Sequence, residues 1–178
     1  MMSGCIAEAS ERWSGGVGIL WRPWIGAASK MVCVEKGRLA TMKFSFKGIG
    51  LVNLCVGYFF ATGRLCPRNK ELLKKAVQVV SEGTEHVLMG ADFNMTPQQV
   101  YPAVNQGRMQ IYAPQGDTCH AGTGRTYDYF VASKGLAVYL REITIQQAGL
   151  ATHNPVSICV KTNGPEEKGQ GDQIGTED

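Results

Sequence analysis

The stretch His86-Val-Leu-Met-Gly-Ala-Asp-Phe-Asn94 decides how the rest of this 178-residue chain is interpreted. Its apolar run from Val87 to Met89 predicts a short buried strand that enters a loop at Gly90. Asp92 and Asn94 lie two residues apart, so in an extended chain they point to the same side. A carboxylate and an amide on one face of a strand end can orient a water molecule and donate to an oxyanion. The alternative is that the two residues only cap the helix that follows.

Two later segments carry isolated polar residues beside apolar runs. Gly124-Arg-Thr-Tyr-Asp-Tyr-Phe-Val-Ala-Ser133 has Asp128 as its only acid, and a carboxylate buried there must pair or accept hydrogen bonds. Ala151-Thr-His-Asn-Pro-Val156 places His153 directly before another apolar strand. A lone histidine is more often structural than catalytic, but an aspartate that accepts from its ring fixes the tautomer and raises its basicity. We therefore expect the two to meet in one surface pocket with the carboxylate and amide of the first segment.

Strand-like runs separated by glycine-rich or charged breaks make up most of the chain. The clearest helix is residues 67–81, where apolar residues recur at three- and four-residue steps opposite lysines. A second helix is expected to start at Thr96-Pro97. The predicted strands are Gly16–Trp21, Met31–Glu35, Leu39–Phe46, Ile49–Phe60, Val87–Met89, Thr126–Ala132, Arg141–Ile145 and Val156–Lys161. The pattern predicts one α/β or α+β domain over residues 1–161, followed by a disordered acidic tail over residues 162–178.

The composition is that of a globular domain with a mild basic excess. It is 44% hydrophobic and 19% charged with a net charge of +3, which argues against disorder, collagen and coiled coil. Acidic residues concentrate in the tail, so the body is basic and compatible with a polyanionic partner. No signal peptide is visible, and the longest apolar stretch, Ile49 to Ala61, is shorter than the ~20 residues of a membrane span. We expect an intracellular protein, nuclear or cytoplasmic, without a membrane partner.

Together these segments resemble the endonuclease/exonuclease/phosphatase superfamily, the metal-dependent phosphodiesterases that include apurinic and retrotransposon endonucleases. The family's GDFN signature is similar to Gly90–Asn94, its DY signature to Tyr127–Phe130 and its SDHxPV signature to Ala151–Val156. Ser14-Gly-Gly-Val-Gly-Ile-Leu20 is similar to its GGVAIL strand. Motifs in this order with matching elements between them are fairly specific. The resemblance implies a two-sheet α/β sandwich.

The resemblance also implies roles for individual residues. Asp92 would align or deprotonate the attacking water, and Asn94 would contact the scissile phosphate. His153, oriented by Asp128, would bind the phosphate oxygen as charge develops on it. Tyr58, at the end of the central strand, would help to hold the phosphate or the leaving group. A divalent cation, Mg²⁺ or Mn²⁺, would be held by Asp92, Asn94 and His153 and would assist the leaving oxygen.

This chain departs from the family pattern in two places. It begins just before the family's third strand, so the two strands that carry an Asn and the chief metal-binding Glu are not present. Thr152 also replaces the Asp that often precedes the catalytic histidine. Because a hard cation needs charged oxygen ligands, we expect weak Mg²⁺ binding and little or no nuclease activity from these residues alone.

Two functions therefore stay open at the level of sequence. The first is a phosphodiester hydrolase whose substrate is nucleic acid or another phosphodiester. The second is a non-catalytic descendant of the same fold that binds a polyanion or a protein. Without the first strands, we also expect an uncovered sheet edge or apolar patch near Gly16–Leu20 and Ile49–Phe60, through which the chain would self-associate.

Overall fold

The computed structural model describes residues 3–6, 16–61, 65–81, 85–106, 108–148, 150 and 152–162. In chain order the elements are β1 (Ser3–Ile6), β2 (Gly18–Trp21), β3 (Val32–Glu35), β4 (Leu39–Phe46), β5 (Gly50–Tyr58), α1 (Pro67–Ser81), β6 (His86–Asp92), α2 (Pro97–Gln106), β7 (Met109–Tyr112), β8 (Asp128–Ser133), the 3-10 helix η1 (Lys134–Tyr139), β9 (Leu140–Ile145) and β10 (Val156–Val160). Apart from Thr162, the predicted acidic tail lies outside the described residues, and its boundary stays a prediction.

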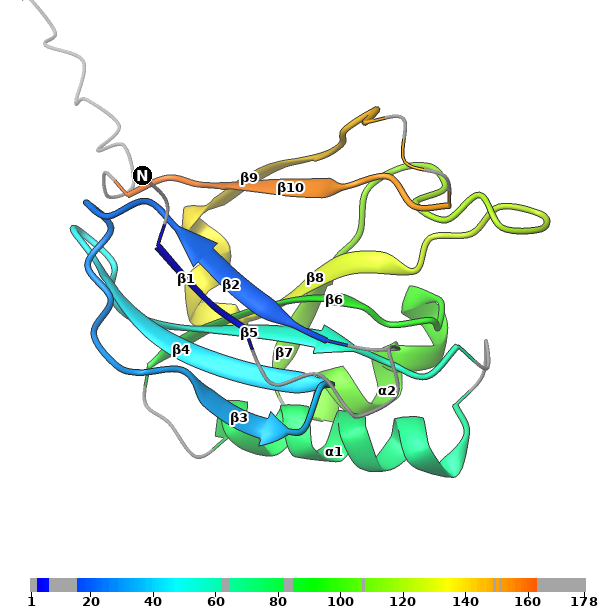
Figure 1. Ribbon diagram of the computed structural model, residues 1–178, viewed down its shortest axis with the longest axis horizontal. Helices are drawn as coiled ribbons and strands as arrows, with labels where there is room; N and C mark the ends of the chain where they lie inside the picture. Colours follow the sequence, from blue (N-terminus) through cyan, green and yellow to red (C-terminus); the bar gives the residue numbers. More distant parts are fainter. Residues whose placement is uncertain are drawn as a thin grey trace, which may run out of the picture.

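A six-stranded sheet in the order β3-β4-β5-β6-β8-β7 forms the centre of the molecule (Figure 1). β5 and β6 are parallel and joined through α1, while the other neighbours are antiparallel. Both α-helices cover one face of this sheet, and the two-stranded sheets β1-β2 and β10-β9 belong to the opposite layer (Figure 1). The predicted two-sheet α/β sandwich is confirmed.

The central strands are buried on both faces, as the nearly continuous apolar run in β5 predicts. Cys55 points to the helix side and packs in one cluster with Leu72 of α1 and Val100 of α2. Val52 points to the other side and packs with Leu136 of η1 and Leu140 of β9. Alternate residues of one strand therefore hold the two layers together.

β6 is longer than the sequence indicates, because the strand continues through Gly90 and Ala91 to Asp92 instead of turning at Gly90. Backbone partners on both sides, β5 and β8, sustain the strand there. A Cβ at Gly90 would lie 3.0 Å from the Phe130 ring, so the glycine permits close packing between strands. Small residues at this point thus serve strand packing. Three elements were not predicted at all: β1, β7 and η1.

An apolar hollow of about 440 Å³ lies between β2 and the central strands β4 and β5. Its lining residues are Leu20, Trp21, Arg22, Ile25, Phe44, Phe46 and Leu54. Leu20 is 70% exposed, which matches the apolar patch expected in this region. None of the helices in the described part of the chain combines the length and the apolar character that crossing a bilayer requires.

Candidate active site

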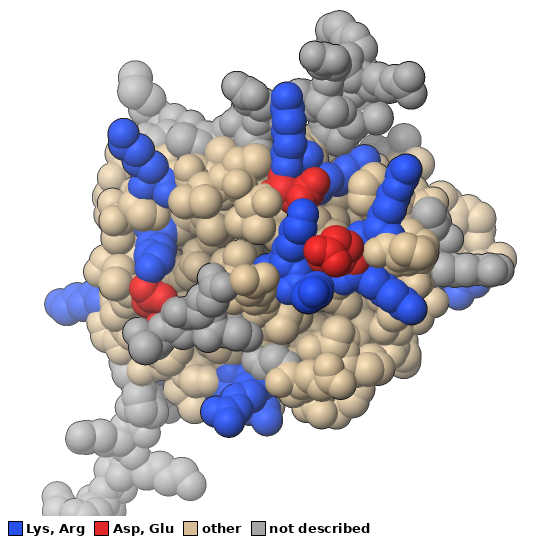
Figure 2. All heavy atoms as spheres, turned by 90° about the horizontal axis from the view of Figure 1, so that it is seen from below, with Lys and Arg blue, Asp and Glu red and all other residues tan. Residues whose placement is uncertain are grey.

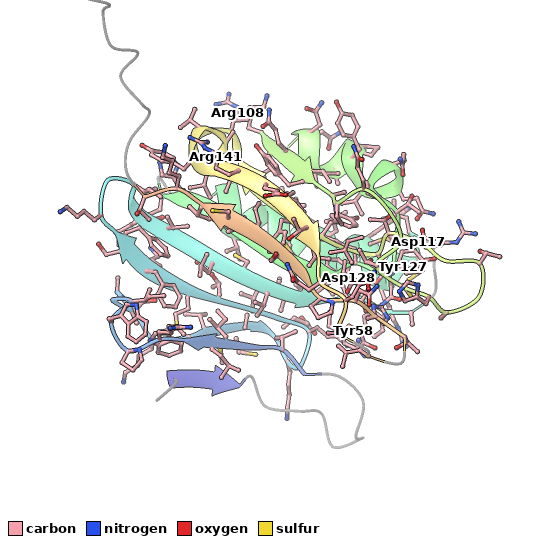
Figure 3. The ribbon with its side chains drawn as sticks, turned by 90° about the horizontal axis from the view of Figure 1, so that it is seen from above. Tyr58, Arg108, Asp117, Tyr127, Asp128 and Arg141 are labelled. Atoms are coloured by element: carbon pink, nitrogen blue, oxygen red, sulfur yellow. The ribbon has the colours of Figure 1, made fainter. Side chains whose placement is uncertain are left out.

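Three strands of the central sheet bring polar residues to one of its ends. β5 ends at Tyr58, β6 ends at Asp92 and β8 begins at Asp128, and the strand register pairs Tyr58 with Asp92 and Asp92 with Asp128. Paired residues on neighbouring strands point to the same face. Figure 3 shows Tyr58 and Asp128 together at this end, far from Arg108 and Arg141. The site therefore lies on the face of the sheet opposite the helices.

His153 completes this group from the segment that leads into β10. Its Nδ1 lies 2.8 Å from Oδ2 of Asp128, and the two side chains are 33% and 22% exposed. A carboxylate only accepts hydrogen bonds, so Nδ1–H donates and Nε2 is left for another partner. The expected pairing of these residues, 25 positions apart, is what the structure contains.

The surroundings of Asp92 disfavour the charged form of its carboxyl group. Burial raises the pKa of its carboxyl above the usual range, and the neighbouring Asp128 charge raises it further. Hydrogen bonds from Asn94 and the proximity of His153 oppose this rise in pKa. The backbone N–H of Asn94 donates to Asp92 Oδ1 at 3.0 Å, which fixes the orientation of the carboxylate.

Asn94 reaches the group by a different geometry from the one expected of an extended chain. Its backbone is left-handed, with φ of 48°, so the chain turns sharply after Asp92. The side chain is buried, and its Nδ2 donates to the carbonyl of Phe59 at 3.0 Å. Asn94 therefore ties the end of β6 to the end of β5, close to Asp92.

The alternative in which Asp92 and Asn94 cap the next helix does not describe this structure. The backbone N–H of Thr96 donates to the side-chain oxygen of Gln99 at 2.8 Å, and the backbone N–H of Gln99 donates to Thr96 O at 3.0 Å. This reciprocal arrangement at the start of α2 resembles a capping box. The carboxylate and the amide are thus available for the site.

Thr118 organises the site, although the sequence analysis missed it. Its side chain is fully buried, and its hydroxyl accepts the backbone N–H groups of Tyr127 and Asp128, both at 2.9 Å. Its carbonyl accepts the N–H of Asn154 at 2.8 Å. One residue therefore connects the start of β8 to the segment of His153. A single threonine in a loop rich in glycine gives no pattern from which this role could be predicted.

His120 was also missed and lies beside the same segment. Its Nε2 is 2.6 Å from Nδ2 of Asn154, and its backbone N–H donates to Thr152 O at 2.8 Å. Since an amide nitrogen only donates, this imidazole nitrogen accepts. The contact holds the chain on either side of His153 against the preceding loop.

Stacked aromatic rings lie beneath the polar group. Phe93 stacks on Phe59 with ring centres 5.0 Å apart and on Tyr129 with centres 4.2 Å apart. All three side chains are almost fully buried. The phenol of Tyr129 donates to Met95 O at 3.2 Å, and burial raises its pKa. This packing gives the strand ends a rigid, apolar support.

The donor atoms of the group are suited to a divalent cation. One atom each from Asp92, Asp128 and His153 all lie within 4.8 Å of one another. Two carboxylates and one imidazole form a donor set that can hold a divalent cation through oxygen and nitrogen atoms. The cluster includes Asp128, which the motif comparison assigned only to histidine orientation.

Known proteins resemble this chain in fold but not in sequence. No family model matches the sequence, and no curated protein matches it. The endonuclease domain of TRAS1, a telomere-specific non-LTR retrotransposon, has a TM-score of 0.74 and 10% identity, covering 91% of this chain and 79% of that one. The AP endonuclease LMAP from Leishmania major has a TM-score of 0.71 and 11% identity, with 90% and 70% covered.

A third solved structure is more distant in shape. CdtB, the biologically active subunit of cytolethal distending toxin, has a TM-score of 0.58 and 15% identity, with 82% of this chain and 61% of that chain covered. At these identities the likeness concerns the fold. The chain therefore shares the α/β fold of these proteins, the two-sheet sandwich that the resemblance of its motifs to the endonuclease/exonuclease/phosphatase superfamily implies.

Proposed function

We propose that this chain is a metal-dependent phosphodiester hydrolase that acts on nucleic acid. The observation that carries the proposal is the 2.8 Å contact between His153 and Asp128, beside Asp92 on the neighbouring strand. Phosphodiester hydrolysis needs one group that activates water and another that stabilises charge on the phosphate. The fold is shared with an AP endonuclease and a retrotransposon endonuclease domain, which supports a nucleic-acid substrate.

In this proposal Asp92 is the general base, because its pKa is raised toward the range in which a carboxylate accepts a proton efficiently. His153 presents Nε2 to a phosphate oxygen, while Asp128 holds the ring and stabilises its protonated form. Asn94 donates from its side-chain amide to Phe59 O and to the Asp92 carboxylate, and in this proposal the N–H that faces Asp92 turns to the scissile phosphate. The roles divide between proton transfer and charge stabilisation.

Tyr58 and the metal ion complete the assignment. Tyr58 is the register partner of Asp92, which supports a role for its phenol in holding the phosphate or the leaving group. Asp92, Asp128 and the neutral imidazole of His153 would hold Mg²⁺ or Mn²⁺, and Asn94 would be a further oxygen donor. When bound, the ion would neutralise charge on the phosphate and the leaving oxygen. Because Thr152 offers no carboxylate, we expect weak ion binding and slow turnover.

The test is cleavage of a supercoiled plasmid and of an abasic duplex oligonucleotide, with protein in excess and Mg²⁺ or Mn²⁺ present. We expect EDTA-sensitive nicking that His153→Ala lowers by about 10²–10⁴-fold, the usual contribution of a positioned acid–base group. His86→Ala is the matched control, because His86 lies at the start of β6, at the opposite end of that strand from Asp92. Cleavage that survives His153→Ala unchanged would contradict the proposal.

A domain that binds a polyanion without hydrolysing it is the second candidate. The observation that favours it is Thr152, an exposed and uncharged residue where the family pattern has a carboxylate. Binding of the same oligonucleotide is measured in parallel with cleavage. Salt-dependent binding with no cleavage in either metal, at any protein concentration, would favour this second candidate.

A further inference from the structure

Two arginines gather around one aromatic ring beside the candidate active site. The guanidinium carbon of Arg38 lies 4.7 Å from the Tyr58 ring centre and 4.3 Å from the Phe60 ring centre. The guanidinium carbon of Arg68, in the first turn of α1, lies 5.5 Å from the same Phe60 centre. Such cation–π contacts hold a guanidinium in place while it keeps its hydrogen-bond donors.

The ring that carries these cations is fixed by the backbone around it. Asn69, which is fully buried, accepts the N–H of Phe60 at 2.8 Å and donates Nδ2 to its carbonyl at 3.1 Å. Arg38 accepts the N–H of Tyr58 through its own carbonyl at 2.8 Å. The segment after β5 is therefore clamped between the start of β4 and the start of α1. The two guanidiniums are pre-organised before any ligand arrives.

The charge of this pair is not neutralised by ion pairing within the described chain. No carboxylate of the described residues lies within ion-pair distance of Arg38 or Arg68. The neighbouring Glu35 is engaged by Lys75. Arg68 borders a hollow of about 280 Å³ that Phe60, Glu71 and Lys75 also line, so the surroundings are mixed in charge. Figure 2 shows Lys and Arg side chains gathered on the face that bears α1, interrupted by a few acids.

The arginines lie beside the site, and only one of them belongs to the face of the sheet that carries it. Arg38 precedes β4 and pairs with Tyr58 of β5, which in turn pairs with Asp92 of β6, so at about 4.8 Å per strand its backbone is roughly 10 Å from Asp92 along the sheet. Arg68 belongs to α1, which covers the opposite face of the sheet (Figure 1). An anion held between the two arginines at the Phe60 ring would therefore be a separate group from a phosphate at His153, with both groups on one extended ligand.

We propose that Arg38 and Arg68, supported by the Phe60 ring, bind a non-scissile phosphate of a nucleic-acid backbone and so position the strand across the site. A stacked, planar guanidinium offers paired N–H donors that match two phosphate oxygens. Contacts of this kind fix the register of a strand without reading its sequence. The inference that these arginines position a strand for cleavage rests on the proposed hydrolase function, whereas the inference that they bind a phosphate does not.

The experiment measures binding of a fluorescently labelled 16-nucleotide single strand by anisotropy over a range of salt concentrations. Arg38→Gln and Arg68→Gln are each expected to weaken binding about tenfold and to reduce the slope of log K against log salt by about one. Arg38→Lys keeps the charge but loses the planar, paired N–H donors. Compared with Arg38→Gln, it should therefore recover most of the parent chain's salt dependence but less of its affinity. Arg108→Gln, at the other end of the molecule (Figure 3), should leave both unchanged.

The outcomes separate this inference from the proposed hydrolase function. If the chain does not cleave the plasmid but Arg68→Gln still reduces the salt dependence of oligonucleotide binding, the phosphate-binding site is supported and the hydrolase function is not. If the chain does cleave, Arg38→Gln should raise KM with little change in kcat. Arg68 is exposed on α1, so its variant tests the site even where Arg38→Gln does not fold. Slopes equal to that of the parent chain in a folded variant would overturn the inference. A mononucleotide that binds as tightly as the oligonucleotide would also overturn it, because the site would then serve a small phosphorylated ligand.

Discussion

The two small sheets opposite the helices, β9-β10 and β1-β2, differ in how closely they pack on the central sheet. On the β9-β10 side, Leu136 is fully buried and Leu140 is 6% exposed against the central sheet. On the β2 side, Leu20 is 70% exposed beside an apolar hollow of about 440 Å³. The packed half is the one that leads into His153, which lies 2.8 Å from Asp128. Dense packing thus coincides with the elements that position the candidate site.

The largest expected effect tests this difference in packing directly. Leu136→Ala removes a fully buried side chain and should lower the free energy of unfolding by about 2–5 kcal/mol. Leu20→Ala removes a mostly exposed one and should change it by about 0.5 kcal/mol or less. Urea unfolding followed by circular dichroism measures both. Equal losses in the two variants would mean that the halves are equally packed in solution.

A smaller effect is expected where the packed half meets the site. Thr118→Val keeps the shape of the side chain but leaves the N–H groups of Tyr127 and Asp128 without their acceptor. Unsatisfied buried donors cost about 1–3 kcal/mol, so the free energy of unfolding should fall by that amount. Cleavage should fall further than stability explains, since Asp128 loses its anchor. Thr123→Val, in the exposed part of the same loop, is the control and should change neither.

The charge on Asp92 should produce a still smaller, pH-dependent effect. Its pKa is raised in the folded state by burial and by Asp128, so the stability contributed by the protonated carboxyl is complete below the ordinary carboxyl pKa. That contribution is lost as the pH rises through the raised value. Asp92→Asn keeps an acceptor oxygen for Asn94 and should therefore stabilise the chain more at pH 7 than at pH 4. Urea unfolding at the two pH values measures this difference, and a gain at pH 4 equal to the gain at pH 7 would contradict the assignment.

The sequence predicts most of the elements because their patterns are local. The helix over residues 67–81 has the bounds expected from its apolar spacing, and the apolar run in β5 is buried on both faces. β7 escaped prediction because four residues, Met109–Tyr112, are too few to show a period. The sequence predicts a β6 that ends before Gly90, because the strand pairing that extends it to Asp92 comes from β5 and β8, which are distant in sequence.

In the candidate site, too, the residues with a local sequence pattern were predicted, and those that depend on contacts between distant segments were not. The pairing of Asp128 with His153 was foreseen because each is an isolated polar residue at the end of an apolar run. The roles of Thr118 and Arg38 were not, since each residue lies in a segment without a motif and acts through contacts with segments distant in sequence. The turn at Asn94 was also missed, because its left-handed backbone is selected by the hydrogen bond to Phe59.

The smallest effect on stability, and the last prediction, concerns the open half. We expect the apolar hollow near Leu20 to make the chain associate with itself at high concentration, because burying exposed apolar surface is favourable by about 25 cal/mol per Å². Leu20→Ser should reduce the sedimentation-equilibrium association constant while changing the free energy of unfolding by about 0.5 kcal/mol or less. Val138→Ser is the matched control, because Val138 is 58% exposed on η1, away from the hollow. If the parent chain sediments as a monomer at all concentrations, the hollow does not drive association. If Val138→Ser disperses the chain as well as Leu20→Ser does, association depends on general surface hydrophobicity, and the contrast between the two halves has no consequence for assembly.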